Sequence, residues 1–269
     1  MKNILATTLL LISTQAFAGP KLYVFDCGLI SLDSLEMFGL LENESSVKEL
    51  FVPCYLVRHE KGLLLWDGGL PKTVADVDGP VPSEGSILNY KRWITDQLSD
   101  MGIAAADVTH AAYSHLHFDH AGAANAFAES EVLMQQKEWD AAFGESAAFV
   151  DTSLFDGLKG ANINFIDGDH DVFGDGSVKL IFAPGHTSGH QMLLVSLANS
   201  GKILLSGDLY HTRANRELRR VPTFNADAAQ TLESMEKIEN LLQESKAVLW
   251  IEHDKALADT LKMAPQYYD

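Results

Sequence analysis

Three histidines and one aspartate stand within six consecutive residues, in the run HLHFDH at positions 115–120. Side chains two positions apart point to the same side of an extended chain. His115 and His117 can therefore share one cation, while Asp119 and His120 can reach a second. A donor set that mixes imidazole and carboxylate suits zinc better than calcium, which prefers oxygen alone. The run predicts a hydrolase site for two divalent metal ions, with zinc as the expected metal.

Other potential ligands stand within three residues after the end of a strand-like apolar run. Strand ends that meet at one edge of a sheet bring distant parts of the chain into one cleft, so we expect these residues to converge on the HxHxDH motif. His190 lies four residues after His186, but we expect it to be a hydrogen-bonded structural residue and not a ligand. The potential ligands are His186 after residues 178–183, Asp208 after 203–206 and His253 after 247–251.

The strand-like runs alternate with helical ones, and no linker or low-complexity tract divides residues 19–269. We therefore expect one α/β domain over this range. Apolar residues at helical spacing predict a helix over residues 87–98 and another over 232–242. The second helix is expected to begin near Asn225 or Asp227, because either side chain can cap a helix N-terminus.

The first 18 residues have the pattern of an export signal. Lys2 gives a short positive start, residues 4–12 are apolar, and the sequence AFA at 16–18 resembles a cleavage site. The apolar run is too short for a permanent membrane span. We expect residues 1–18 to be a signal peptide and the remaining chain to be periplasmic or secreted. A retained N-terminal anchor is the alternative.

Acidic residues outnumber basic ones, and the formal net charge is −17. Loss of Lys2 with the signal peptide would bring the charge to −18. Such a charge repels nucleic acid and anionic membrane surfaces. We therefore expect a small-molecule substrate, no nucleic-acid partner and no membrane association after signal removal.

The chain contains two cysteines, Cys27 and Cys54, each within a strand-like segment. A disulfide survives in an exported protein, but it requires the two Cα atoms to lie within about 7 Å of each other. Because the sequence does not show this proximity, we expect two buried thiols. A disulfide is the alternative.

The ordered set Asp67, HLHFDH, His186, Asp208 and His253 resembles the metallo-β-lactamase superfamily and, within it, the N-acyl-homoserine lactonases. The similarity extends over residues 22–254, and the complete set is specific although each piece alone is weak. The resemblance implies an α/β fold, the αβ/βα four-layer sandwich of that superfamily. It also implies a site at the edge of two facing sheets.

The resemblance divides seven ligands between two metal ions that share one carboxylate. Two cations about 3.5–4 Å apart can activate a water molecule and polarise a substrate carbonyl. Asp119 would also pass a proton to the leaving alkoxide, and Asp67 would orient metal-bound imidazoles. By resemblance, His115, His117 and His186 bind one metal, Asp119, His120 and His253 bind the other, and Asp208 bridges both.

The chain departs from the lactonase pattern after the bridging aspartate. Lactonases usually carry a tyrosine three residues later, whereas this chain has His211 there and Tyr210 one position early. Thr212 and Asn215 match the residues of the family at the same offsets, so the alignment needs no gap. We therefore assign to His211 the role of donor to the developing oxyanion, with Tyr210 as the alternative.

The expected reaction is the opening of a lactone ring, most of all that of an N-acyl-homoserine lactone, which would make the protein a quorum-quenching hydrolase. Met37, Phe38 and Phe118 are candidates to receive the acyl chain. A metallo-β-lactamase is the main alternative, but the zinc β-lactamases usually carry Cys or Ser in place of Asp208.

Other carboxylic ester or thioester hydrolases of the same fold are further alternatives. A thioesterase of the glyoxalase II type is less favoured because only 16 residues follow His253, where those enzymes carry a helical domain. The negative charge disfavours a phosphodiesterase that acts on nucleic acid. A protein that binds metal without catalysis is the alternative from a different class.

Overall fold

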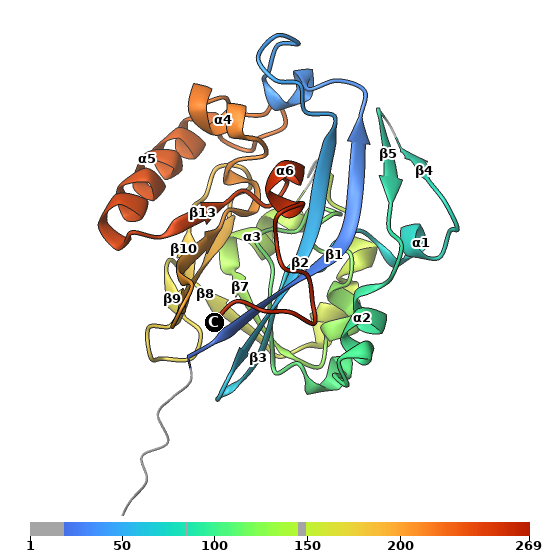
Figure 1. Ribbon diagram of the computed structural model, residues 1–269, viewed down its shortest axis with the longest axis vertical. Coiled ribbons are helices and arrows are strands. Elements are labelled where there is room, and N and C mark those ends of the chain that lie inside the picture. The colour runs from blue at the N-terminus through green and yellow to red at the C-terminus, as the bar shows by residue number, and fades with distance from the viewer. Residues whose placement is uncertain (1–18, 84, 145–148) are drawn as a thin grey trace, which may run out of the picture.

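The computed structural model describes residues 19–83, 85–144 and 149–269, and the predicted signal peptide lies outside the described residues. Two β-sheets face each other, and helices cover their outer sides (Figure 1). The eight-stranded sheet contains, in spatial order, β4 (Val81–Ser83), β5 (Ser86–Asn89), β1 (Lys21–Leu32), β2 (Glu49–His59), β3 (Gly62–Trp66), β6 (His110–Ala112), β7 (Glu131–Gln135) and β8 (Ile163–Ile166).

The five-stranded sheet is antiparallel except for its last pair, in which β12 and β13 are parallel. Its spatial order is β13 (Val248–Trp250), β12 (Gly201–Leu205), β11 (Gln191–Leu197), β10 (Val178–Phe182) and β9 (His170–Asp171). The α-helices are α1 (Lys72–Ala75), α2 (Ile94–Asp100), α3 (Gln136–Ala142), α4 (Arg213–Leu218), α5 (Ala228–Ser245) and α6 (Lys255–Ala258).

Alternating strand residues build the layers. Val24 of β1 packs between the two sheets, whereas its neighbour Phe25 packs on the outer face in the same core cluster as Ile94 of α2. In the other sheet, Leu193 of β11 faces inward and Leu194 packs outward in the cluster that contains residues of α5. Because successive strand residues point to opposite faces, each sheet buries both of its faces. The predicted four-layer αβ/βα sandwich is thus confirmed.

One helix prediction is half wrong and the other is correct. The segment 87–98 begins as strand β5 and becomes helical only at Ile94, because β5 pairs with β1 and this pairing overrides the apolar spacing. The second predicted helix is α5. Asp227 is its cap, and the carboxylate accepts a hydrogen bond from the Gln230 N–H at 3.0 Å.

The expectation of two buried thiols is wrong, because Cys27 and Cys54 form a disulfide. Antiparallel pairing of β1 with β2 brings their Cα atoms to 5.7 Å. This contact joins positions 27 residues apart and arises from the strand register, which the local sequence does not reveal. The bridge crosslinks the neighbouring strands β1 and β2 of the larger sheet.

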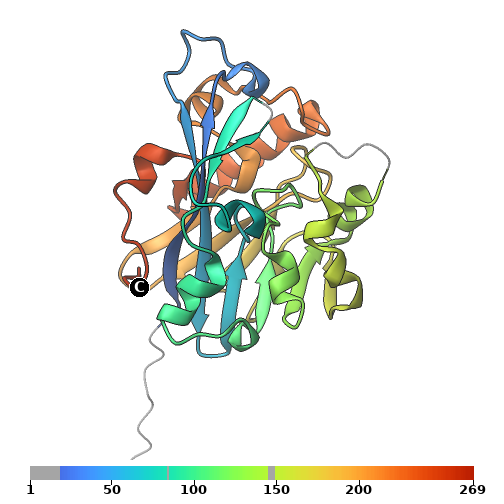
Figure 2. The ribbon, with the colours of Figure 1, turned by 90° about the vertical axis from the view of Figure 1, so that its right-hand side faces the viewer.

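Parallel pairing gathers the motif-bearing strand ends at one edge of the sandwich. β3 and β6 are parallel neighbours, so Asp67 and the HxHxDH motif leave the larger sheet on the same side. β12 and β13 are parallel as well, so Asp208 and His253 leave the smaller sheet together. The two sheets lie face to face in both views of the ribbon (Figure 1, Figure 2). No described helix combines the length and the apolar character that a membrane span requires.

Candidate metal centre

The HxHxDH segment leaves β6 as an irregular stretch and then turns. Leu116 is buried in the apolar core, while the imidazoles before and after it face the opposite side. The turn follows because the N–H groups of His120 and Ala121 both donate to the carbonyl of His117, at 3.1 and 2.9 Å. The turn brings Asp119 and His120 beside the two preceding histidines.

The first cluster contains three imidazoles and one carboxylate, all buried. His186 Nε2 lies 3.1 Å from His115 Nε2 and 3.2 Å from His117 Nδ1. Asp208 Oδ2 lies 3.4 Å from His186 Nε2 and 3.6 Å from His115 Nε2. Two nitrogens bound to one tetrahedral zinc would be about 3.3 Å apart, given zinc–nitrogen bonds of about 2.0–2.1 Å. The spacing fits a single cation.

The second cluster contains Asp119, His120 and His253. The Nε2 atoms of the two histidines lie 3.3 Å apart. Asp119 Oδ2 lies 3.9 Å from His120 Nε2 and 3.7 Å from His253 Nε2. These distances also fit ligands around one cation.

Asp208 joins the two clusters. While its Oδ2 atom faces the first cluster, its Oδ1 atom lies 3.2 Å from His120 Nε2 and 3.0 Å from His253 Nε2. The Oδ1 atom is buried and makes no hydrogen bond of good geometry among the described residues. Such a carboxylate, with one oxygen toward each histidine cluster, is suited to bridge two divalent cations and to offset their mutual repulsion.

The protonation state of the first cluster agrees with a cation site. Burial lowers the pKa of His115 and His186 well below the ordinary value, and it lowers the pKa of His117 to about 3. These imidazoles are therefore neutral, which is the form that binds metal. Burial alone would raise the pKa of Asp208, but the imidazoles of His211, His120 and His253 hold it well below its ordinary value.

The second cluster carries more negative charge around its imidazoles. Burial opposes protonation of His253, yet Asp208 and Asp119 raise its pKa to about 9. The pKa of His120 is also raised, because Asp208 and Asp67 outweigh the effect of burial. The excess of carboxylate around these two imidazoles is suited to attract a cation.

Asp67 supports the second cluster from behind. Its Oδ2 atom lies 2.8 Å from His120 Nδ1, and its Oδ1 atom accepts the Ser114 N–H at 2.6 Å. A carboxylate on Nδ1 directs Nε2 toward the cluster, so the predicted orienting role of Asp67 agrees with its position. Asp67 itself has a φ of 57°, and this left-handed conformation turns the chain sharply at the end of β3.

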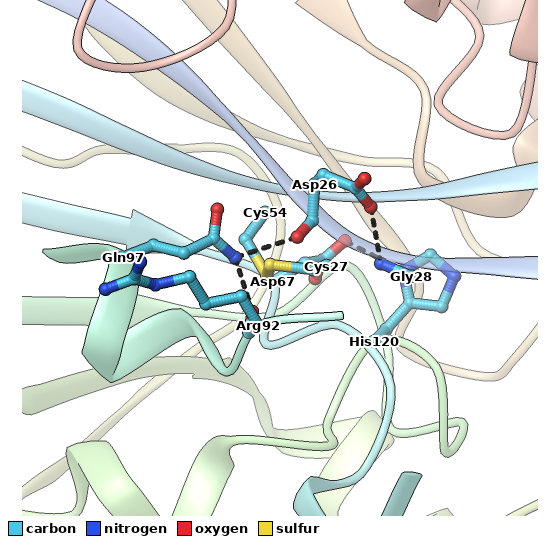
Figure 3. The surroundings of a disulfide bond; sticks show 8 residues. All are labelled: Asp26, Cys27, Gly28, Cys54, Asp67, Arg92, Gln97 and His120. Carbon is cyan, nitrogen blue, oxygen red and sulfur yellow. Dashed lines mark hydrogen bonds and ion pairs between the residues drawn. A yellow bond between two sulfur atoms is a disulfide. The ribbon is translucent and has the colours of Figure 1, made fainter. Parts of the chain in front are cut away.

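The turn after Asp67 has no room for side chains. A Cβ on Gly69 would lie 2.3 Å from Cys27 Cβ, so the turn rests directly on the disulfide. Figure 3 shows this bridge together with Asp67 and His120. A Cβ on Gly122 would lie 2.2 Å from the Gly69 carbonyl oxygen. The wall behind the second cluster is therefore packed backbone against backbone.

His190 is structural, as the sequence predicts. Its Nδ1 atom lies 2.9 Å from the Ala183 carbonyl oxygen, to which it donates, and its Nε2 atom accepts the Asp208 N–H at 2.9 Å. Burial lowers the pKa of His190 to about 4, so the ring is neutral and its Nε2 atom can accept. A Cβ on Gly207 would lie 2.6 Å from this atom, so the approach requires glycine. His190 thus fixes the backbone that carries Asp208.

His211 lies at the site and Tyr210 does not. His211 Nε2 is 3.0 Å from Asp208 Oδ2, and the ring packs between Phe38 and Phe224, with centroids 4.9 and 5.6 Å away. The Tyr210 hydroxyl instead donates to Glu239 Oε1 at 2.9 Å, against helix α5. The alternative assignment of the donor role to Tyr210 is wrong, because Glu239 holds the Tyr210 hydroxyl away from the two clusters.

An apolar cavity of about 300 Å³ opens onto the two clusters. Met37, Phe38 and Phe118 line it, which agrees with their predicted place near the site. Phe149 and Phe224 complete the aromatic part of the wall, and they were not predicted because they come from distant segments. The polar lining is His117, Asp119, Asp208, His211 and His253, together with Ser83, Gly85 and Ser86.

Three supporting residues also escaped the sequence analysis. Asn225, considered there only as a helix cap, has its Oδ1 atom 3.1 Å from His186 Nδ1. Glu252 Oε1 accepts the Trp66 Nε1–H at 3.0 Å and the Gly207 N–H at 2.9 Å. Glu138 is the third and is considered below.

We predict that Asp208→Ala loses at least one metal ion per chain, because both clusters lose an oxygen at once. Turnover should fall by more than about 100-fold, the upper range for residues that only support metal ligands. Elemental analysis of purified protein measures the first effect and kcat the second. Asp169→Ala, which removes an exposed carboxylate paired with Lys237, is the control and should keep the metal content of the unaltered protein. Full metal content and activity in Asp208→Ala would contradict the assignment.

Comparison with known proteins agrees with the fold and the ordered motif. Residues 47–244 match the family model of the metallo-beta-lactamase superfamily. N-acyl homoserine lactonase AttM of Azorhizobium caulinodans is 33% identical, and the match covers 93% of this chain and 98% of that protein. AttM of Rhizobium johnstonii is 31% identical over 92% of this chain and 98% of its own length.

A solved structure of Bacillus thuringiensis AiiA, a variant with N-decanoyl-L-homoserine bound at the active site, superimposes with a TM-score of 0.80. It shares 28% identity with this chain, and the match covers 93% of this chain and 99% of AiiA. Sequence, fold and the clustered histidines and aspartates lead to the same assignment. The chain is a metal-dependent hydrolase that belongs to the metallo-β-lactamase superfamily and, within it, to the N-acyl homoserine lactonase family.

Proposed function

We propose that this enzyme opens the lactone ring of N-acyl homoserine lactones and thereby acts in quorum quenching. The observation that carries the proposal is the position of Asp208, which faces both histidine clusters and lines an apolar cavity. A substrate with an ester at one end and an alkyl chain at the other matches this arrangement. The AiiA complex with N-decanoyl-L-homoserine, the ring-opened product, supports the same substrate class.

The two ends of such a substrate would meet different surroundings. The acyl chain would lie against Met37, Phe38 and Phe118, where burial of each methylene is favourable. The lactone ring would lie beside Asp119 and His211, which belong to the polar part of the lining. The apolar wall thus binds the tail and holds the ester at the clusters.

We propose zinc for both sites, because buried imidazoles with a few carboxylates form a donor set that zinc favours. When bound, a pair of such cations supplies an activated water molecule and polarises the ester carbonyl. Asp119 faces the cavity beside the second cluster and would hand a proton to the leaving alkoxide. His211 would donate a hydrogen bond to the oxyanion as it forms.

We predict that kcat/KM rises with acyl length until the cavity is full. Each buried methylene contributes about 0.8 kcal/mol, which corresponds to about fourfold. A pH-stat comparison of butanoyl, octanoyl and decanoyl homoserine lactones with δ-valerolactone and a carbapenem measures this series. The unacylated lactone should react slowly and the carbapenem not detectably. A preference for the carbapenem would identify a β-lactamase instead.

We predict that His211→Phe lowers kcat by about 100-fold or more, the usual effect of removing one oxyanion donor. KM should change little, because the donor acts mainly in the transition state. His211→Tyr restores a hydroxyl of the kind lactonases usually carry there, and it should recover part of the lost rate. Steady-state kinetics of metal-loaded variants with equal metal content provide the measurement. A kcat within twofold of the unaltered enzyme in His211→Phe would exclude the role.

We also propose that the protein is exported with cleavage after Ala18. The export pattern of residues 1–18 supports this, and so does the Cys27–Cys54 disulfide, since such bonds persist in oxidising compartments. Expression of the full chain in a Gram-negative host should yield periplasmic protein that begins at Gly19 and has no titratable thiol. N-terminal sequencing and thiol titration test this, with a chain that lacks residues 2–18 as the cytoplasmic control. Uncleaved cytoplasmic protein with two free thiols would refute export.

A further inference from the structure

Glu138 is a buried carboxylate outside both clusters. It lies in helix α3 with 3% of its surface exposed. Within the described part of the chain, no lysine or arginine lies at ion-pair distance from it. A buried acid without a basic partner is costly unless hydrogen bonds compensate for the lost water. Its hydrogen bonds therefore indicate what the residue does.

Three donors surround the carboxylate, and they come from two separate loops. Glu138 Oε1 accepts the Leu116 N–H at 2.9 Å. Glu138 Oε2 accepts the Gly189 N–H at 3.0 Å and the Thr187 hydroxyl at 2.6 Å. One oxygen thus serves the loop at 115–117, and the other serves the loop at 186–190.

Both loops carry histidines of the first cluster. Leu116 stands between His115 and His117, and Thr187 directly follows His186. The loops are also joined at one end by the Gln191 N–H, which donates to the Ser114 carbonyl at 2.9 Å. Glu138 adds a second link between the two loops. Two links fix the angle between the loops as well as their separation. The relative orientation of the three imidazoles therefore depends on this carboxylate.

The packing around Glu138 shows that helix α3 and the two loops approach one another closely. A Cβ on Gly189 would lie 2.3 Å from the Glu138 backbone nitrogen, so only glycine permits this approach. Burial raises the pKa of Glu138, and the hydrogen bonds from Thr187, Leu116 and Gly189 oppose that rise. The N–H groups need an acceptor on each side, which a carboxylate provides and an amide does not.

We propose that Glu138 is a positioning residue, which sets the geometry of the His115, His117 and His186 cation site without touching cation or substrate. The inference rests on the proposed function only in so far as that function requires a cation at this cluster. It concerns the affinity of one of two metal sites, so it can be tested without substrate.

The test is a titration of metal-stripped protein with Zn²⁺ in competition with a chromophoric chelator. Glu138→Gln keeps the size of the side chain but replaces one acceptor oxygen by a donor. We expect one of the two Zn²⁺ binding steps to weaken by about 10- to 100-fold, with the other step within threefold of the unaltered protein. The visible spectrum of the Co²⁺-loaded protein should change for that same step. Thr187→Val removes only the hydroxyl donor and should weaken the same step by less.

The matched control is Glu239→Gln. Glu239 also accepts three hydrogen bonds, from Tyr210 and from two nitrogens of Arg216, but it faces α4 and not the clusters. In Glu239→Gln, the affinities of both Zn²⁺ binding steps should stay within threefold of those of the unaltered protein. Unchanged steps in Glu138→Gln, or an equal weakening of both steps together with a lower melting temperature, would overturn the proposal. If Glu138→Gln does not fold, the Thr187→Val titration decides by the same criterion. Two normal Zn²⁺ steps in a protein inactive on lactones would refute the proposed substrate and leave this inference intact.

Discussion

The position of the Asp208 carboxylate is the constraint on which the rest of the site depends. Its oxygens face two groups of imidazoles at 3.0 to 3.6 Å, and so one side chain must satisfy two sites at once. The surrounding structure fixes its backbone from both sides, through His190 on the Asp208 N–H and Glu252 on the Gly207 N–H. Each sheet contributes part of the arrangement, because β12 and β13 carry Asp208 and His253 while β3 and β6 carry the other supports.

Much of the site could be predicted because its ligands are polar residues at the ends of apolar runs. HLHFDH is local, and Asp67, His186, Asp208 and His253 each follow a recognisable strand, so convergence at one edge was a sound expectation. The structural role of His190 also agreed. The features that depend on long-range contacts were predicted wrongly. The disulfide depends on the register of β1 with β2, and the first half of the predicted helix at 87–98 is a strand because it pairs with β1. Glu138 gave no usable signal, since a glutamate in a short helix is ordinarily exposed.

The segment that carries His211 is held in place by the residues that follow it. Thr212 caps helix α4 by accepting the Asn215 N–H, and the Asn215 amide donates to the Phe38 carbonyl at 2.8 Å. These contacts hold the segment after Asp208 against the cavity wall, so a different side chain can occupy the third position in the same backbone. These contacts do not involve the His211 side chain, so they position the segment independently of the donor that it carries.

The glycine contacts behind the second cluster bear on how this molecule can evolve. Gly69 and Gly122 meet backbone to backbone, and a single added carbon would collide with a carbonyl or with the crosslinked cysteines. Substitution of either glycine is therefore disfavoured. The opposite wall is made of interchangeable apolar side chains such as Met37 and Phe118. We therefore expect new substrate preferences to arise through substitutions in the apolar wall of the cavity, while the backbone behind the second cluster stays unchanged.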